Sequence, residues 1–157
     1  MMWLFFMGCV TLYHQVDVGW VSGPSEDGAA HGAMVAYNIV AVPDGEYFGV
    51  GGALSFLDTD HGEKSATAEA VGFAELWTPP INDTPFGWHV RGDTLQFIAF
   101  PIPTGLSLRT GPHVEFGEHG TRISVDAMGR VAAHVRPIVH WGTIASLRWE
   151  LGLLIDE

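Results

Sequence analysis

Apolar and polar residues alternate with a period of two along most of this chain. Between residues 10 and 20 the even positions are mostly apolar, including Val16 and Val18, whereas Gln15 and Asp17 occupy odd positions. Successive side chains of a β-strand point to opposite faces, so a strand gathers these apolar residues on one side and a helix does not. The alternation therefore predicts a strand in this segment.

The same alternation recurs in segments that are separated by turn-forming residues. The further segments that it predicts as strands are 31–42, 47–57, 65–77, 86–100, 106–116, 122–127, 130–136 and 146–155. Two alternatives stay open. Residues 65–77 are rich in alanine and glutamate, which also favour a short helix. Gly92-Asp93 would divide residues 86–100 into an extra hairpin if it formed a tight turn.

Glycine and proline are spread along the chain rather than clustered. Its 20 glycines and nine prolines suit many short elements joined by tight turns. Gly49, Gly51 and Gly52 lie inside a predicted strand, which indicates strong curvature or close packing against another backbone. With 157 residues and no repeat or linker, residues 1–157 are predicted to form one all-β domain, an antiparallel up-and-down barrel of about eight strands.

Charged residues and histidines share the polar parity of the last predicted strands. If residues 117–120 form a hairpin turn, Glu115 lies opposite Arg122 and His113 lies opposite Ser124. Opposite charges at facing positions stabilise a strand pair. We predict that this parity forms an interior polar network or a ligand-binding surface, made of Arg109, His113, Glu115, Arg122, Asp126, His134, Arg136, Arg148 and Glu150.

The alternation does not say which face of the barrel points inward. In one interpretation the polar parity fills the barrel and the apolar parity faces lipid. In the other, the apolar parity surrounds a core or a lipid-sized cavity and the polar parity faces water. The scarcity of lysine, with Lys64 as the only one, favours lipid. So does the position of aromatic residues near predicted strand ends, namely Trp20, Tyr47, Phe48, Trp77, Phe86, Trp88 and Trp141.

The segment from Thr104 to Ile155, with its alternating strands and glycine turns, resembles the C-terminal half of small bacterial outer-membrane β-barrels. The resemblance implies a structural or interaction protein of the bacterial outer membrane, with membrane lipid as its partner. Proteins of that class usually end on an aromatic residue, whereas this chain ends in Leu154-Ile-Asp-Glu157. The alternative is a soluble or lipid-anchored, lipocalin-like barrel, periplasmic or extracellular, that binds a small apolar ligand.

The first nine residues are apolar and end in Gly8-Cys9. This ending resembles that of a bacterial lipoprotein signal, which implies a residual signal segment over residues 1–9 and lipid attachment at Cys9. The alternative is a buried first strand with an inert thiol. As the only cysteine, Cys9 has no partner for a disulfide within the chain.

Composition and charge exclude several classes of protein. Hydrophobic residues make up 47% of the chain and charged residues 16%, which is the reverse of a disordered chain. The net charge of −11 repels phosphate backbones, so nucleic acid is not an expected partner. No run reaches the roughly 18 apolar residues of a transmembrane helix.

No metal, cofactor or catalytic residue is predicted. His113 and Glu115 share a face, but His134 and His140 lie about 20 Å apart along a strand, too far to share one ion. The carboxylates of residues 58–63 lack the remaining ligands of a calcium loop. A hydrolase could in principle assemble Ser107 or Ser124 with His113 and an acid, yet no nucleophile-elbow glycine pattern is present.

Overall fold

The computed structural model describes residues 10–25, 28–44, 46–60, 64–81, 84–97, 105–116, 121–133 and 137–150. These residues form eight antiparallel strands, and none of them is helical. No described segment is a helix long and apolar enough to cross a membrane.

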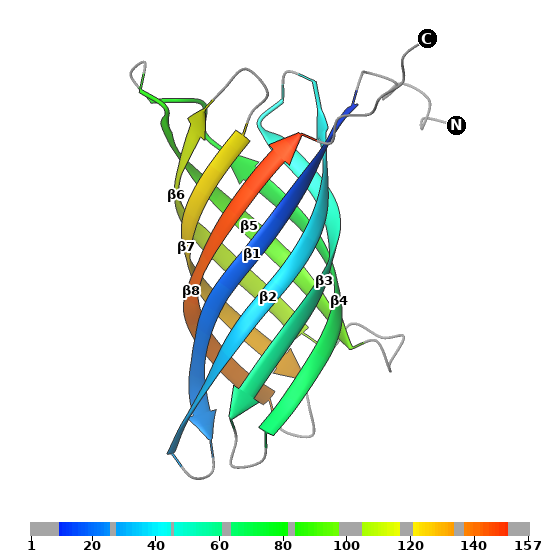
Figure 1. Ribbon diagram of the computed structural model, residues 1–157, viewed down its shortest axis with the longest axis vertical. Coiled ribbons are helices and arrows are strands. Elements are labelled where there is room, and N and C mark those ends of the chain that lie inside the picture. The colour runs from blue at the N-terminus through cyan, green and yellow to red at the C-terminus, as the bar shows by residue number, and fades with distance from the viewer. Residues whose placement is uncertain are drawn as a thin grey trace, which may run out of the picture.

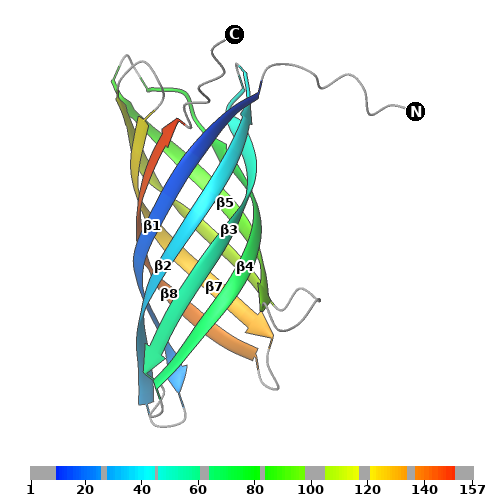
Figure 2. The same ribbon diagram turned by 45° about the vertical axis from the view of Figure 1, so that its right-hand side comes forward.

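The strands pair in chain order, and the last closes onto the first (Figure 1). Their bounds are β1 Val10–Ser25, β2 Gly28–Pro43, β3 Phe48–Asp60, β4 Lys64–Trp77, β5 Phe86–Phe97, β6 Gly105–Phe116, β7 Thr121–Ala133 and β8 Pro137–Glu150. Turning the molecule shows the strong common tilt of the strands around a narrow barrel (Figure 2). The predicted all-β up-and-down barrel of about eight strands is thereby confirmed.

Several strands differ from their predicted extents. β4 is a strand throughout, because it pairs along its length with β3 and along much of it with β5, and these contacts override the helix propensity of its alanines and glutamates. β5 continues through Gly92-Asp93, which pairs with Leu108 and Ser107 of β6, so the extra hairpin is wrong. Residues 122–136 were predicted as two segments but lie mostly in one strand, β7, and β8 begins at Pro137 rather than at 146.

The predicted register between β6 and β7 is confirmed. Glu115 faces Arg122, and His113 faces Ser124. The pairing on the other edge of β7 brings Arg122 opposite Arg148 of β8. Polar residues of three successive strands therefore share the same face and the same end of the barrel.

The barrel carries its polar residues inside and its apolar residues outside. Along β7, inward Arg122, Ser124 and Asp126 are buried, whereas Ile123 and Val125 between them are about half exposed. The buried apolar residues are fewer and form two clusters inside the barrel. One consists of Val21, Met34, Leu57, Met128 and Ile144, and the other of Val40, Val42 and Phe73.

The close packing predicted for the glycines of β3 is present at Gly51. A Cβ at this position would lie 2.5 Å from Cζ of Phe73 and would overlap the carbonyl oxygen of Ile39. Gly52 points outward, and the nearest atom to its Cβ position is the Val71 oxygen at 3.7 Å. The absence of a side chain at Gly51 therefore lets the Phe73 ring lie across the barrel interior.

We predict that Gly51→Val lowers the free energy of unfolding by about 1–3 kcal/mol, since an overpacked interior must shift backbone and ring together. Gly52→Val, on the outer face of the same strand, is the matched control and should change it little. Urea unfolding followed by tryptophan fluorescence measures both. Equal effects of the two substitutions would contradict the assignment of Gly51 to the inner face of β3 and of Gly52 to its outer face.

Candidate functional site

The interior of the barrel holds a balanced set of charges. Among the residues that the structure describes, five arginines and five acids are buried there: Arg91, Arg109, Arg122, Arg130 and Arg148 with Asp17, Glu69, Glu75, Asp93 and Asp126. Removing them from the 18 acids and seven bases of the sequence leaves 13 acids and two bases. The whole net charge of −11 therefore belongs to residues other than this interior set.

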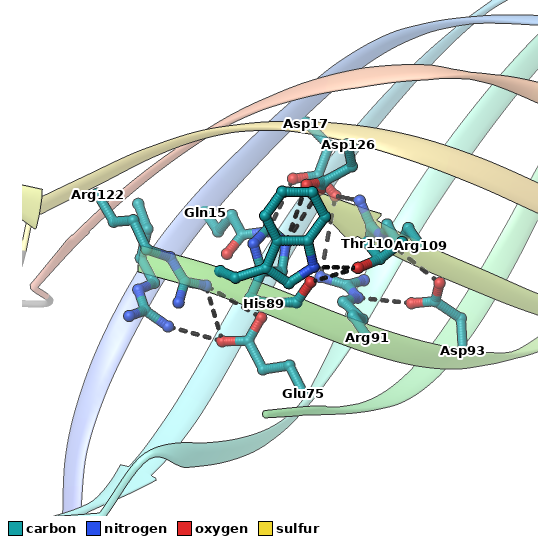
Figure 3. A network of polar contacts seen from close by, with 12 residues as sticks. Gln15, Asp17, Glu75, His89, Arg91, Asp93, Arg109, Thr110, Arg122 and Asp126 are labelled. Carbon is teal, nitrogen blue, oxygen red and sulfur yellow. Dashed lines mark hydrogen bonds and ion pairs between the residues drawn. The ribbon is translucent and has the colours of Figure 1, made fainter. Parts of the chain in front are cut away.

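The central part of this set links β1 to β5 and β6 (Figure 3). Arg109 donates from Nη1 to Oδ2 of Asp17 at 2.7 Å, and Arg91 donates from Nε to Oδ1 of Asp93 at 2.6 Å. Nε of Arg109 lies 3.4 Å from the second oxygen of Asp93. Arg91 and Arg109 face each other in register, so the two carboxylates offset a repulsion between like charges.

Arg91 also has an aromatic and an amide partner. Its guanidinium carbon lies 3.4 Å from the centre of the Phe73 ring, and its Nη2 donates to Oδ1 of Asn38 at 2.8 Å. The ring of Phe73 lies over Gly51, so glycine, ring and guanidinium form a stack across the barrel. This stack fills the interior at the level of the central charges.

A second cluster lies toward the end of the barrel where β1 begins and β8 ends. Glu75 accepts hydrogen bonds from Arg148 at 2.6 Å and from Arg122 at 3.1 Å. Both guanidiniums lie near the ring of Trp77, and that of Arg148 also lies 5.0 Å from the ring centre of Tyr13. Trp77 therefore points into the barrel, whereas the sequence suggested that it marks a membrane interface on the outside.

Two histidines lie between these clusters. Nε2 of His89 is 3.1 Å from Asp126, and Nε2 of His113 is 3.7 Å from Oε1 of Glu115. The two rings are tilted against each other with centres 5.8 Å apart. Asp126 is thus bonded to His89, whereas His113 lies beside Glu115 and faces Ser124 across the strand pair.

At the opposite end, Arg130 pairs with Glu69. This contact joins β7 to β4 across the barrel, between residues 61 positions apart in the sequence. Within the part of the chain that the structure describes, no group of three or more His, Cys, Asp or Glu residues is placed to hold a metal ion.

The structure places most of the predicted network residues in the interior. Arg109, His113, Arg122, Asp126 and Arg148 are buried there. Glu115 and Glu150 share the inward parity near the barrel end and are partly exposed. His134, Arg136 and Cys9 lie outside the described residues, so their roles stay predictions.

The predicted network lacks eight buried titratable residues of the described interior. Arg130 and His140 lie in β7 and β8, and the other six lie in the first five strands: Asp17, Glu69, Glu75, His89, Arg91 and Asp93. All six of these occupy odd positions, and alternation groups them on one face of each strand without saying that this face points inward. In β4 the alternation of polar and apolar residues is weak, because apolar Val71 and Phe73 share the inward face with Glu69 and Glu75.

No protein-family model matches the chain, and no curated protein or solved structure is significantly similar to it. What the barrel does is therefore inferred from its own residues.

The shared carboxylate of Glu75 gives a test of this network. Glu75→Gln leaves two buried guanidiniums without their common counter-charge, and we expect a loss of about 3–5 kcal/mol in the free energy of unfolding. Glu46→Gln, in the exposed turn after β2, should change it by less than about 0.5 kcal/mol. Urea unfolding of both variants is the measurement, and a small effect at Glu75 would mean that the arginines find other partners.

Proposed function

We propose that this chain is a membrane-embedded β-barrel of the bacterial outer membrane. In this proposal it serves as a structural or interaction protein with a filled polar interior, and it presents acidic ends to partners. The apolar outer face would contact lipid, and the interior would leave no wide channel.

The observation that carries the proposal is the chemistry of the outer face. The structure describes 24 large apolar side chains that are at least 41% exposed. Water-soluble monomers rarely expose a continuous apolar patch of more than a few hundred Å². Among the outward strand residues whose side chains are described, only Asp58, near the end of β3, carries a formal charge. Such a surface suits hydrocarbon better than water.

Polar atoms on the outer face are also bonded within the barrel. Trp88 donates its indole N–H to Oγ1 of Thr110 at 2.7 Å, and Oγ1 of Thr110 donates to the carbonyl of His89. Oγ1 of Thr94 donates to the carbonyl of Gly72 at 3.0 Å. In hydrocarbon no water is present to satisfy such groups, so internal bonding of this kind supports a lipid-facing surface.

The strand lengths agree with this proposal. The eight strands are 12 to 16 residues long. About 9–11 residues suffice to cross the hydrocarbon at the tilt of a membrane barrel. The strands therefore extend beyond the apolar layer at one or both ends.

A lipocalin-like role has less support from the cavities. The cavity among the central charges is about 20 Å³ in volume, room for about one water molecule. A recess of about 180 Å³ at the end of the barrel is lined in part by Asp44, Glu46, Glu115 and Arg148, which do not suit an apolar ligand. A ligand pocket usually measures at least about 300 Å³.

The distribution of charge over the barrel indicates which kind of partner it would bind. Because the buried charges cancel, the net charge of −11 belongs to the other charged residues, and those with described side chains include Asp44, Glu46 and Asp58 near the barrel ends. Acidic ends favour basic partners and disfavour nucleic acid. We therefore propose that protein partners meet the barrel at its ends, whereas lipid covers its sides.

Val125→Arg tests which medium the outer face meets. Val125 lies in the middle of β7 and is 50% exposed. In a bilayer an arginine there should cost about 2–4 kcal/mol, and near an interface about 0–1 kcal/mol. Asp58→Arg near the end of β3 is the matched control. The free energy of unfolding in lipid vesicles measures both.

In water, by contrast, an arginine at either position would simply be solvated. If the two variants unfold with the same free energy in vesicles, the outer face does not lie in hydrocarbon and the proposal fails.

A further inference from the structure

The small cavity inside the barrel is lined in one part by apolar side chains and in the rest by hydrogen-bonding side chains, most of them donors. It lies against three arginines and two serines, drawn from β3, β5, β6 and β7. Four of them have a buried polar atom that makes no hydrogen bond within the described residues, namely Nη1 of Arg91, Nε of Arg130, Oγ of Ser55 and Oγ of Ser107, whereas Nε of Arg109 lies 3.4 Å from Oδ2 of Asp93. All five side chains belong to residues that are at least 93% buried.

The strand register explains why the donors gather here. Arg91 faces Arg109 across β5 and β6, and in the next inward row Ser107 lies between Asp93 of β5 and Arg130 of β7. Three guanidinium groups are thus fixed on neighbouring positions of three paired strands. Each of these arginines pairs with a carboxylate, but of those carboxylates only Asp93 lines the cavity, so the charged residues of the lining are three arginines and one aspartate.

The acceptors nearby are already engaged. Asp93 also lines the cavity, but its Oδ1 accepts from Arg91 and its Oδ2 is 3.4 Å from Nε of Arg109. Only the two serine oxygens remain as acceptors toward the cavity. A water molecule could donate its two protons to these two oxygens and accept from two donors, which leaves the remaining donors of the cavity without an acceptor. An anion accepts from every donor and needs no acceptor.

We propose that this cavity binds one monoatomic monovalent anion, such as chloride, held by the guanidiniums of Arg91, Arg109 and Arg130 and by the hydroxyls of Ser55 and Ser107. The volume of about 20 Å³ suits an occupant close to water in size and excludes sulfate or phosphate. The site lies within the polar interior, so this inference stands whether the outer face meets lipid or water. The ion would enter when the barrel closes on folding.

The test is the structure of the full chain refolded and crystallised in sodium bromide, with data collected at the bromine absorption edge. We expect one anomalous peak per chain, between Ser55 and Ser107. A parallel crystal from sodium sulfate should show no such peak. If the bromide crystal contains a folded barrel without a peak in the cavity, the site holds water at most and the inference is wrong.

Ser107→Val removes a hydroxyl and fills part of the cavity, and should abolish the peak. Ser146→Val is the matched control, because Ser146 is equally buried and its Oγ also lacks a hydrogen bond, but it does not line this cavity. A peak that survives Ser107→Val, or that disappears in Ser146→Val, would overturn the assignment. Membrane insertion of the same samples is measured separately. The anion site and the membrane location can therefore be disproved independently of each other.

Discussion

The requirement that buried charges be paired governs this barrel. Each of the five buried arginines has at least one carboxylate within ion-pair distance, and those carboxylates are buried as well. The pairs join strands that are distant in sequence: Asp17 and Arg109 are 92 residues apart, and Arg148 and Glu75 are 73 apart. Because an unpaired buried charge is costly, a slip in register or a failure to close would destabilise the barrel by separating these pairs.

The same requirement explains the distribution of polar and apolar residues. With charges paired inside, the interior holds only two small apolar clusters, and most of the large apolar side chains that the structure describes lie on the outer face. A barrel built this way needs a surrounding medium that tolerates an apolar surface. Lipid is such a medium, and the paired interior, the bonded outer hydroxyls and the single outward charge of Asp58 are consistent with it. The acidic ends are then the parts that meet water.

Much of this fold was readable from the sequence, because alternation fixes which residues share a face. The facing of Glu115 with Arg122 followed from parity and one short turn, and the structure has it. The partners of the arginines were not readable in this way. Asp17 meets Arg109 only because β1 closes onto β8 and the narrow barrel brings opposite walls together. Local sequence contains no information on such contacts across the interior.

Parity also left the direction of the faces open, and position near a strand end or a turn-forming dipeptide misled at single sites. Trp77 was expected at an outer interface, but its inward position places it against Arg122 and Arg148. The continuity of β5 through Gly92-Asp93 likewise depends on pairing with β6, which overrides the turn preference of the dipeptide. In both cases long-range contacts decided a choice that local preference left open.

The most direct test of the central claim is whether the folded chain needs an amphiphile. The chain is refolded in buffer and in detergent, and each sample is run on a gel with and without boiling. We predict folding only in detergent, with a faster-migrating band that shifts on boiling. A folded monomer that stays in buffer would contradict a lipid-facing outer surface.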